Sequence, residues 1–276
     1  MKWLHFILSH SIFVAICAVG LAFQTAQLLQ VETHVSVYGF IFFATLCSYN
    51  FYWLLSKFSF AGRGFFSGLL KKELAGVCLL VVSAAGLLFC LLRSPLQMNH
   101  VATAVLLTVV YSIPLLPFKF LRFTRKAGVL KTTLLAFTWV YVTAFLPMEK
   151  PYSLLDSADI FILTRRFLFM LMLCIIFDSR DIAVDKIRGL RSLATDLSPA
   201  TLQILIYSIF VIMFATNFLS TYYDISSYQS IALQTSTIAL LVVYFYSTKK
   251  QDYLFYYFVV DGLMLFSALT TYIASI

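Results

Sequence analysis

The chain has 276 residues, of which 61% are hydrophobic and only 12% are charged, and its formal net charge is +8. This composition excludes an ordinary soluble domain, in which about 25% of residues are charged, and its apolar content excludes a disordered chain. We therefore expect a multi-pass membrane protein that forms a single integral-membrane domain over residues 1–276. Lys and Arg of such proteins gather in cytoplasmic loops, so the positive charge does not predict a nucleic-acid partner.

Stretches without charged residues predict nine membrane-spanning helices and an all-α fold. A hydrocarbon core about 30 Å thick requires about 20 helical residues. The first stretch resembles a signal peptide, but it is long for one and eight further stretches follow, so we interpret it as a membrane span. The nine predicted spans lie within residues 3–31, 33–56, 74–92, 94–118, 132–148, 160–177, 197–223, 225–248 and 253–276.

The sixth predicted span, residues 160–177, contains two adjacent arginines. The apolar segment Phe167–Phe177 alone is too short to cross a membrane. Including Ile160–Thr164 makes the helix long enough, but it places Arg165 and Arg166 inside the helix near one end. We expect these long side chains to extend toward the membrane interface.

The distribution of Lys and Arg predicts the orientation of the chain. With nine spans, all but four of the 20 Lys and Arg residues lie on the side of the N-terminus. The four on the opposite side are Arg93, Lys150, Arg165 and Arg166. Because positively charged loops remain in the cytoplasm, we expect a cytoplasmic N-terminus and an external C-terminus.

Three carboxylates follow the sixth span with the spacing i, i+3, i+7: Asp178, Asp181 and Asp185. On a helix these residues lie within an arc of about 60°. Carboxylates on one face repel each other unless a cation lies among them. A set of oxygen ligands at this spacing suits Mg²⁺, which commonly bridges to the phosphates of a substrate.

Basic residues alternate with these acids, and they are Arg180, Lys186, Arg188 and Arg191. A metal combined with such cations could hold a diphosphate. The alternative is a solvated helix end in which acids and bases form i,i+4 pairs. We favour the functional interpretation, because three acids share one face at the cytoplasmic mouth of a helix bundle.

Asp261 interrupts the last predicted span, eight residues from its start. An ionisable group at that depth faces the bundle interior or finds a partner there. We interpret Asp261 first as a structural hydrogen-bonding residue and second as a residue of a cavity.

Two segments carry a resemblance to a known family. The pattern D-x-x-D-x-x-x-D followed by R-G-x-x-x-x-x-T resembles the second aspartate motif of the UbiA-type intramembrane prenyltransferase superfamily. Its residues here are Asp178, Asp181, Asp185, Arg188, Gly189 and Thr195. The segment Tyr111–Lys119, followed by Arg122 and Gly128, is similar to the family's Y-S-x-P…K-R…G segment.

The resemblance implies a helical bundle around a central cavity, which binds an isoprenyl diphosphate with Mg²⁺ at the cytoplasmic side. It implies transfer of the prenyl group to a lipophilic, often aromatic, acceptor. The catalytic residues would be Asp178, Asp181, Asp185 and Lys119, and the three aspartates would hold the metal. The substrate-binding residues would be Asn50, Lys57, Tyr111, Lys119, Arg122, Arg180, Lys186 and Arg188.

The first aspartate motif of that family is degenerate in this chain. Asn50 matches it, but Phe51, Leu54 and Phe58 stand where the family has acids, and no Asp or Glu lies between Glu32 and Glu73.

Lys57 lies seven residues after Asn50, on the same helix face. Its ammonium group could contact the diphosphate in place of a metal. The stronger interpretation is an interfacial lysine that follows the positive-inside rule.

Three functions remain open on the sequence. The first is a prenyltransferase with an altered metal site, and the second is a related binder of prenyl or lipid phosphates without transfer chemistry. The third is an unrelated nine-helix transporter or scaffold. Three clustered acids argue against a scaffold, and a transporter would carry more polar residues at the midplane of its helices. We favour the enzyme, because loss of catalysis would not explain a complete second motif.

Overall fold

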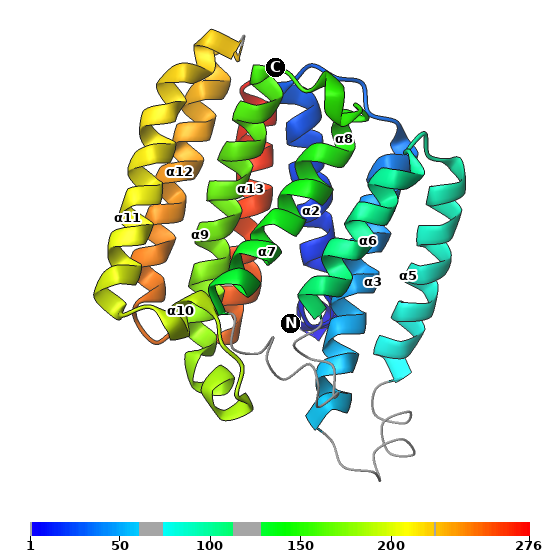
Figure 1. The fold of residues 1–276 in the computed structure, drawn as a ribbon, viewed down its shortest axis with the longest axis vertical. Coiled ribbons are helices and arrows are strands. Elements are labelled where there is room, and N and C mark those ends of the chain that lie inside the picture. Colours follow the sequence, from blue (N-terminus) through cyan, green and yellow to red (C-terminus); the bar gives the residue numbers. More distant parts are fainter. Residues whose placement is uncertain (1, 61–73, 113–127, 224) are drawn as a thin grey trace.

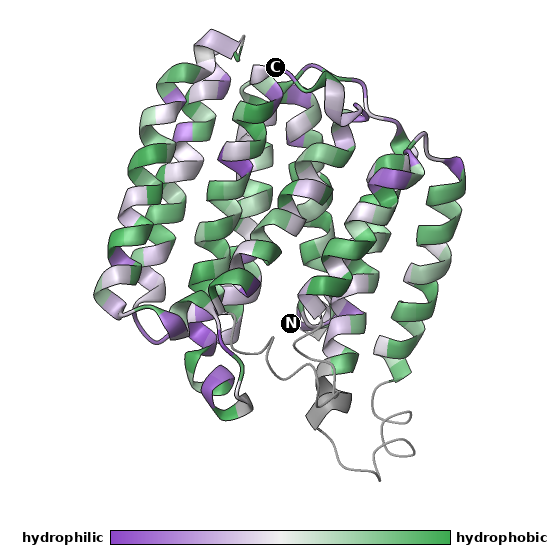
Figure 2. Ribbon diagram, viewed as in Figure 1, coloured by the Kyte–Doolittle hydropathy of each residue, from purple (hydrophilic) through white to green (hydrophobic). Residues whose placement is uncertain are grey.

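The computed structural model describes residues 2–60, 74–112, 128–223 and 225–276. Within these ranges every regular element is a helix (Figure 1). Hydrophobic residues cover the helices along their length and hydrophilic residues gather toward their ends (Figure 2). The helical structure itself also has a physical cause, since a chain in lipid must satisfy its backbone hydrogen bonds within each helix.

Seven helical segments of the described chain are long and apolar enough to cross a membrane, so the protein is a multi-pass membrane protein. Several of them combine two or three elements. The segments are Val35–Leu55 of α3 (Val35–Phe60), α5 (Leu74–Arg93), α7 (Gly128–Val140) with η3 (Tyr141–Phe145) and α8 (Leu146–Met148), α9 (Ser157–Arg188), α11 (Pro199–Thr216) with the start of η5 (Asn217–Tyr223), α12 (Ser227–Ser247), and η6 (Phe255–Val260) with α13 (Asp261–Ile273).

The first predicted span is not one straight helix. It consists of α1 (Lys2–Ser9) and α2 (Ile12–Leu28), which meet at an angle of 67°. Ser11 adopts a left-handed backbone conformation at the break, with φ of 61°. The amide of Asn50 donates hydrogen bonds to the carbonyl oxygens of His10 and Leu46, at 3.2 and 2.8 Å. A side chain of α3 therefore satisfies the backbone group that the break leaves free.

The fourth predicted span contains α6 (Met98–Ser112), an apolar helix of 15 residues. Its described part is shorter than the predicted stretch 94–118, because residues 113–127 lie outside the described chain.

Helix α9 is the centre of the packing. It contacts α7, α11 and α12, and Met172, Ile175 and Ile176 are among its fully buried side chains. On the other side of the bundle α3 packs along α5 (Figure 1). A Cβ atom on Gly39 would lie 2.7 Å from the Cys90 sulfur, so glycine permits this close approach. The outer face of α5 exposes Val81 and Val82, as expected for a surface in contact with lipid.

Both ends of α9 are capped. At its start the Asp156 carboxylate accepts a hydrogen bond from the backbone N–H of Asp159. This hydrogen bond and the charge of Lys150 lower the pKa of Asp156. Lys150 also bonds both oxygens of the buried Asp159, at 3.0 and 2.9 Å. At its end Gly189 adopts a left-handed conformation, with φ of 65°, and the backbone N–H of Leu190 returns to the Asp185 carbonyl. The glycine of the matched R-G pair thus ends the helix.

Some of the described chain ends and connections can be assigned to the two ends of the bundle (Figure 1). The N-terminus, the end of α9, the short α10 (Leu193–Asp196) and the α12–η6 connection lie at one end, and the C-terminus lies at the other.

Arg165 and Arg166 do not extend to an interface. Both side chains are buried, with 6% and 5% of their surface exposed, and they hydrogen-bond to α2 and α11. The prediction of interfacial arginines is therefore wrong. The physical reason is that α2 and α11 offer carbonyl and side-chain oxygens within hydrogen-bond distance of both guanidinium groups.

Candidate functional site

The three aspartates lie on the last turns of α9, as the spacing predicted, and each has a partner. Asp178 accepts a hydrogen bond from the hydroxyl of Thr132. Asp181 accepts two hydrogen bonds of 2.7 Å from the guanidinium of its neighbour Arg180. Asp185 is buried and forms an ion pair with Lys131, with 3.9 Å between nitrogen and oxygen.

Lys131 is the residue that joins the acids into one cluster. Its side chain is 13% exposed and interacts electrostatically with all three carboxylates. Like charges on one helix face require such a cation. Lys131 was not predicted as a site residue, because no local sequence pattern links it to an acid on α9.

Thr132, the residue after Lys131 in α7, links Asp178 of α9 to the start of α10. Its hydroxyl oxygen also accepts a hydrogen bond of 3.0 Å from the backbone N–H of Leu193 in α10. Gly128 lies one turn earlier, where a Cβ atom would come within 2.6 Å of the Ser192 carbonyl oxygen. Gly128 and Thr132 therefore allow α10 to dock against the start of α7, next to the acids.

Thr195, the last residue of the matched motif, has a structural place in this turn. Its hydroxyl accepts a hydrogen bond from the Ser192 backbone N–H at 2.8 Å and closes the capping box of α10. Arg191 pairs with Asp196 at 2.8 Å in the same turn. The end of the motif thus shapes the chain that follows the carboxylates.

Aromatic rings surround the guanidinium of Arg180. Its central carbon lies 5.1, 5.0 and 5.1 Å from the ring centres of Phe177, Tyr256 and Tyr257. Cations at this distance from ring faces are attracted by the ring quadrupole. The two tyrosines belong to the π-helix η6, a type of helix that often marks functional sites.

Asp261 directly follows η6 and is buried, with 9% of its surface exposed. The expectation that it faces the bundle interior is therefore confirmed. Arg180 is the cation that acts on it. Nearby Tyr253 stacks on Tyr257 at 4.3 Å, and burial raises the pKa of Tyr253.

Tyrosines of α3 and α6 face the acid cluster from the other side. Tyr52 and Tyr111 stack with 5.3 Å between ring centres, and Tyr111 interacts electrostatically with Asp178. Tyr52 interacts in the same way with Lys131. Tyr49 packs edge-on against Trp139 and still exposes 37% of its surface. The region that matches the degenerate first motif therefore lies close to the second motif.

The structure describes only some of the other predicted site residues. The Asn50 amide nitrogen is engaged at the α1–α2 break, and Lys186 is exposed. Lys119 and Arg122 lie outside the described residues, as do the side chains of Lys57 and Arg188. The roles predicted for these residues stay predictions.

The carboxylates suit Mg²⁺ in chemical kind, since that ion prefers oxygen ligands. In the described part of the chain, however, no three His, Cys, Asp or Glu side chains are arranged to hold a metal. The acids instead contact Thr132, Arg180 and Lys131. Mg²⁺ would have to compete with these partners for the carboxylate oxygens.

Comparisons with family models, with curated proteins and with solved structures find no match to this chain. The chemistry of the cluster therefore rests on its own residues. It combines three carboxylates, two buried or half-buried cations and a set of aromatic faces at one end of a membrane-spanning bundle.

Proposed function

We propose that the chain is an intramembrane prenyltransferase-like protein. It takes an isoprenyl diphosphate and transfers the prenyl group to a lipophilic, aromatic acceptor. The observation that supports this most is the cluster of Asp178, Asp181 and Asp185 around Lys131, with tyrosines of α3, α6 and η6 beside it. The residues combine binding groups for a diphosphate with aromatic faces suited to an allylic cation.

In this proposal the diphosphate lies at the end of α9. Lys131 and Arg180 bind its oxygens, and Lys119, Arg122 and Lys57 add the further cations predicted from the sequence. The three aspartates would hold Mg²⁺, which would supply positive charge to the leaving diphosphate. The proposal places the prenyl chain beside the rings of Tyr49 and Tyr111, whose faces would stabilise the developing carbocation.

The proposal also includes the membrane arrangement. The bent pair α1–α2 and the short α6 each count as one span, which completes nine spans together with the seven longer segments. The end of the bundle that carries the acids then faces the cytoplasm, and the C-terminus is external.

A second candidate function is a binder of prenyl or lipid phosphates without transfer chemistry. Two observations favour it. Phe51, Leu54 and Phe58 replace the acids of the first motif, and the acids of the second are engaged by cations of the chain itself. Such a site could hold a phosphate with Lys131 and Arg180 alone.

Release of diphosphate from labelled prenyl diphosphates of several chain lengths, with a panel of aromatic acceptors, tests the proposal. We expect release that depends on Mg²⁺ and falls by about 10²–10³ in Asp181→Asn, because a stabiliser of developing charge is lost. Asp252→Asn is the matched control, because Asp252 is an exposed acid at the same end of the bundle. Tight binding of these diphosphates without release under any condition would overturn the transferase and leave the binder.

A further inference from the structure

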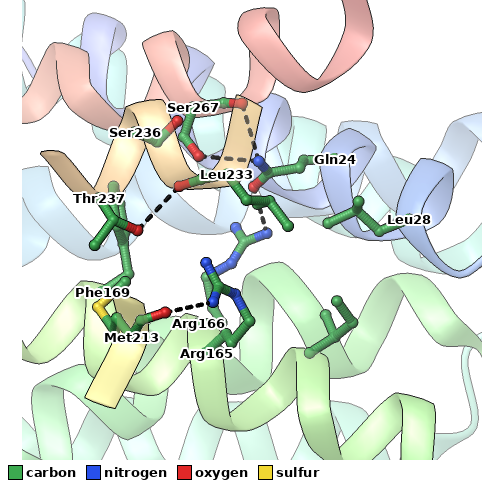
Figure 3. Close-up of a pocket in the computed structure, with 11 residues that line it drawn as sticks. Gln24, Leu28, Arg165, Arg166, Phe169, Met213, Leu233, Ser236, Thr237 and Ser267 are labelled. Atoms are coloured by element: carbon green, nitrogen blue, oxygen red, sulfur yellow. Dashed lines mark hydrogen bonds between the residues drawn. The ribbon is translucent and has the colours of Figure 1, made fainter. Parts of the chain in front are cut away.

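Two adjacent arginines lie buried in the half of the bundle away from the acid cluster. Arg165 and Arg166 expose 6% and 5% of their surface and line one pocket (Figure 3). The other residues of the pocket come from α9 itself and from α2, α11, α12 and α13, so five helices line it. Two charges so close together, and so deep, require an explanation.

The partners of both guanidinium groups are neutral. Arg165 donates to the Met213 carbonyl oxygen at 2.9 Å and to the Thr216 hydroxyl at 3.5 Å. Arg166 donates through Nη2 to the Leu21 carbonyl, the Gln24 amide oxygen and the Thr25 hydroxyl, at 3.0, 2.9 and 3.1 Å. Over residues 2–60, 74–112, 128–223 and 225–276 neither arginine forms an ion pair.

One donor group remains unused. Nη1 of Arg166 is buried and has no hydrogen-bond partner among the described residues. A buried donor without a partner destabilises the folded state, and more so when it carries charge. Because arginine retains its proton in proteins, the site cannot escape this cost by becoming neutral. Because no described acid compensates these two cations, the pocket favours binding of an anion.

The size of the pocket limits what can bind. Its volume of about 30 Å³ corresponds to room for one or two water molecules. Leu28, Ile162 and Phe169 form apolar walls, and the hydroxyls of Ser236 and Thr237 already donate to backbone carbonyls. A lipid headgroup or a diphosphate is too large, whereas a halide ion has about the size of a water molecule.

We propose that this pocket is a binding site for a small monovalent anion of the chloride class, held between the guanidinium groups of Arg165 and Arg166. The anion accepts a hydrogen bond from Nη1 of Arg166 and compensates the charge of both arginines. The site is separate from the acid cluster of α9 and independent of the proposed transferase reaction.

Crystals of the full chain grown with bromide in place of chloride test the site directly. We expect an anomalous scattering peak between the two guanidinium groups. A pocket that holds only water, or nothing, in bromide would overturn the proposal. This measurement uses the unaltered protein and does not depend on the folding of a variant.

Thermal unfolding in detergent gives the second test. At constant ionic strength, replacing gluconate by chloride should raise Tm by several degrees in a saturable way, because an anion that binds only the folded state stabilises it. Arg166→Gln and Arg165→Gln should each lose this rise. Arg93→Gln should keep it, because Arg93 is an exposed arginine of α5. An equal rise in all four proteins would show a general salt effect and overturn the proposal.

Asp224 provides the decisive comparison, because it follows η5 in sequence and lies outside the described residues. If its carboxylate compensates the arginines, the parent protein shows no chloride response and Asp224→Asn gains one. That outcome would mean that an internal ion pair with Asp224, and not a bound anion, compensates the arginines. A chloride response that is equal in the parent and in Asp224→Asn supports the anion site.

Discussion

Lys131 shows how a single residue changes the chemistry of a carboxylate cluster. Its ammonium group interacts with Asp178, Asp181 and Asp185, although it belongs to a different helix. Two charges about 4 Å apart near a protein surface interact with about 4 kcal/mol. The lysine therefore competes with any metal ion for the same oxygens.

Replacing Lys131 by glutamine should increase the affinity of the cluster for Mg²⁺ at least tenfold. The three carboxylates then repel each other without an internal cation, and a divalent ion relieves that repulsion. Calorimetric titration of the detergent-solubilised protein with Mg²⁺ measures the change. Lys186→Gln is the control, since Lys186 lies exposed on the same helix. Equal affinities in the parent and in Lys131→Gln would contradict the role given to Lys131.

The acids of the site could be predicted from the sequence, but their partners could not. Asp178, Asp181 and Asp185 stand close together along the chain, so their spacing alone places them on one helix face. Thr132 contacts Asp178 across 46 positions of sequence, and no periodicity reports such a contact. The placement of the acids on one helix is local and could be predicted, whereas their partners are supplied by tertiary packing.

At the scale of elements, the docking of α10 on α7 depends on the absence of a side chain at Gly128. A Cβ atom there would lie 2.5 Å from an oxygen of Asp196 and 2.7 Å from the Ser192 backbone nitrogen. Because these contacts include backbone atoms, no rotation of a side chain can relieve them.

Gly128→Ala should lower the free energy of unfolding by about 1–3 kcal/mol, the usual cost of overpacking. Gly262→Ala is the matched control, because its Cβ atom would lie 3.7 Å from Phe13, an ordinary contact. Alanine in a helix is favoured over glycine by about 1 kcal/mol, so the control should be neutral or stabilising. Thermal unfolding of both variants measures the difference. A similar Tm for the two would show that α10 is not held tightly against α7.

The helices were largely predictable, because lipid excludes charged residues from long segments of the chain. The break at Ser11 was not, since neither Gly nor Pro lies there. It is stabilised from a distance by the Asn50 side chain. Arg165 and Arg166 were misplaced for a similar reason, because only the packed bundle shows that α2 and α11 supply their acceptors.

At the scale of the whole molecule, an odd number of spans places the two termini on opposite sides of the membrane. A reporter fused after Ile276 should therefore read as external, and one fused at the N-terminus as cytoplasmic. Reporters placed after Met148 and after Ser198 provide internal references, because these residues lie at opposite ends of the bundle (Figure 1). A cytoplasmic reading at Ile276 would mean that the bent α1–α2 pair or the short α6 does not cross.

The partners of the two arginines imply an order of assembly during membrane insertion. An arginine at the centre of an isolated helix raises the cost of insertion by about 2.5–3.5 kcal/mol. Arg166 finds its acceptors in α2, which is synthesised before α9, but Arg165 donates to Met213 of α11, which is synthesised after it. Helix α9 therefore settles fully into the bilayer only once the chain has extended through α11, so its insertion is coupled to that of the following helix.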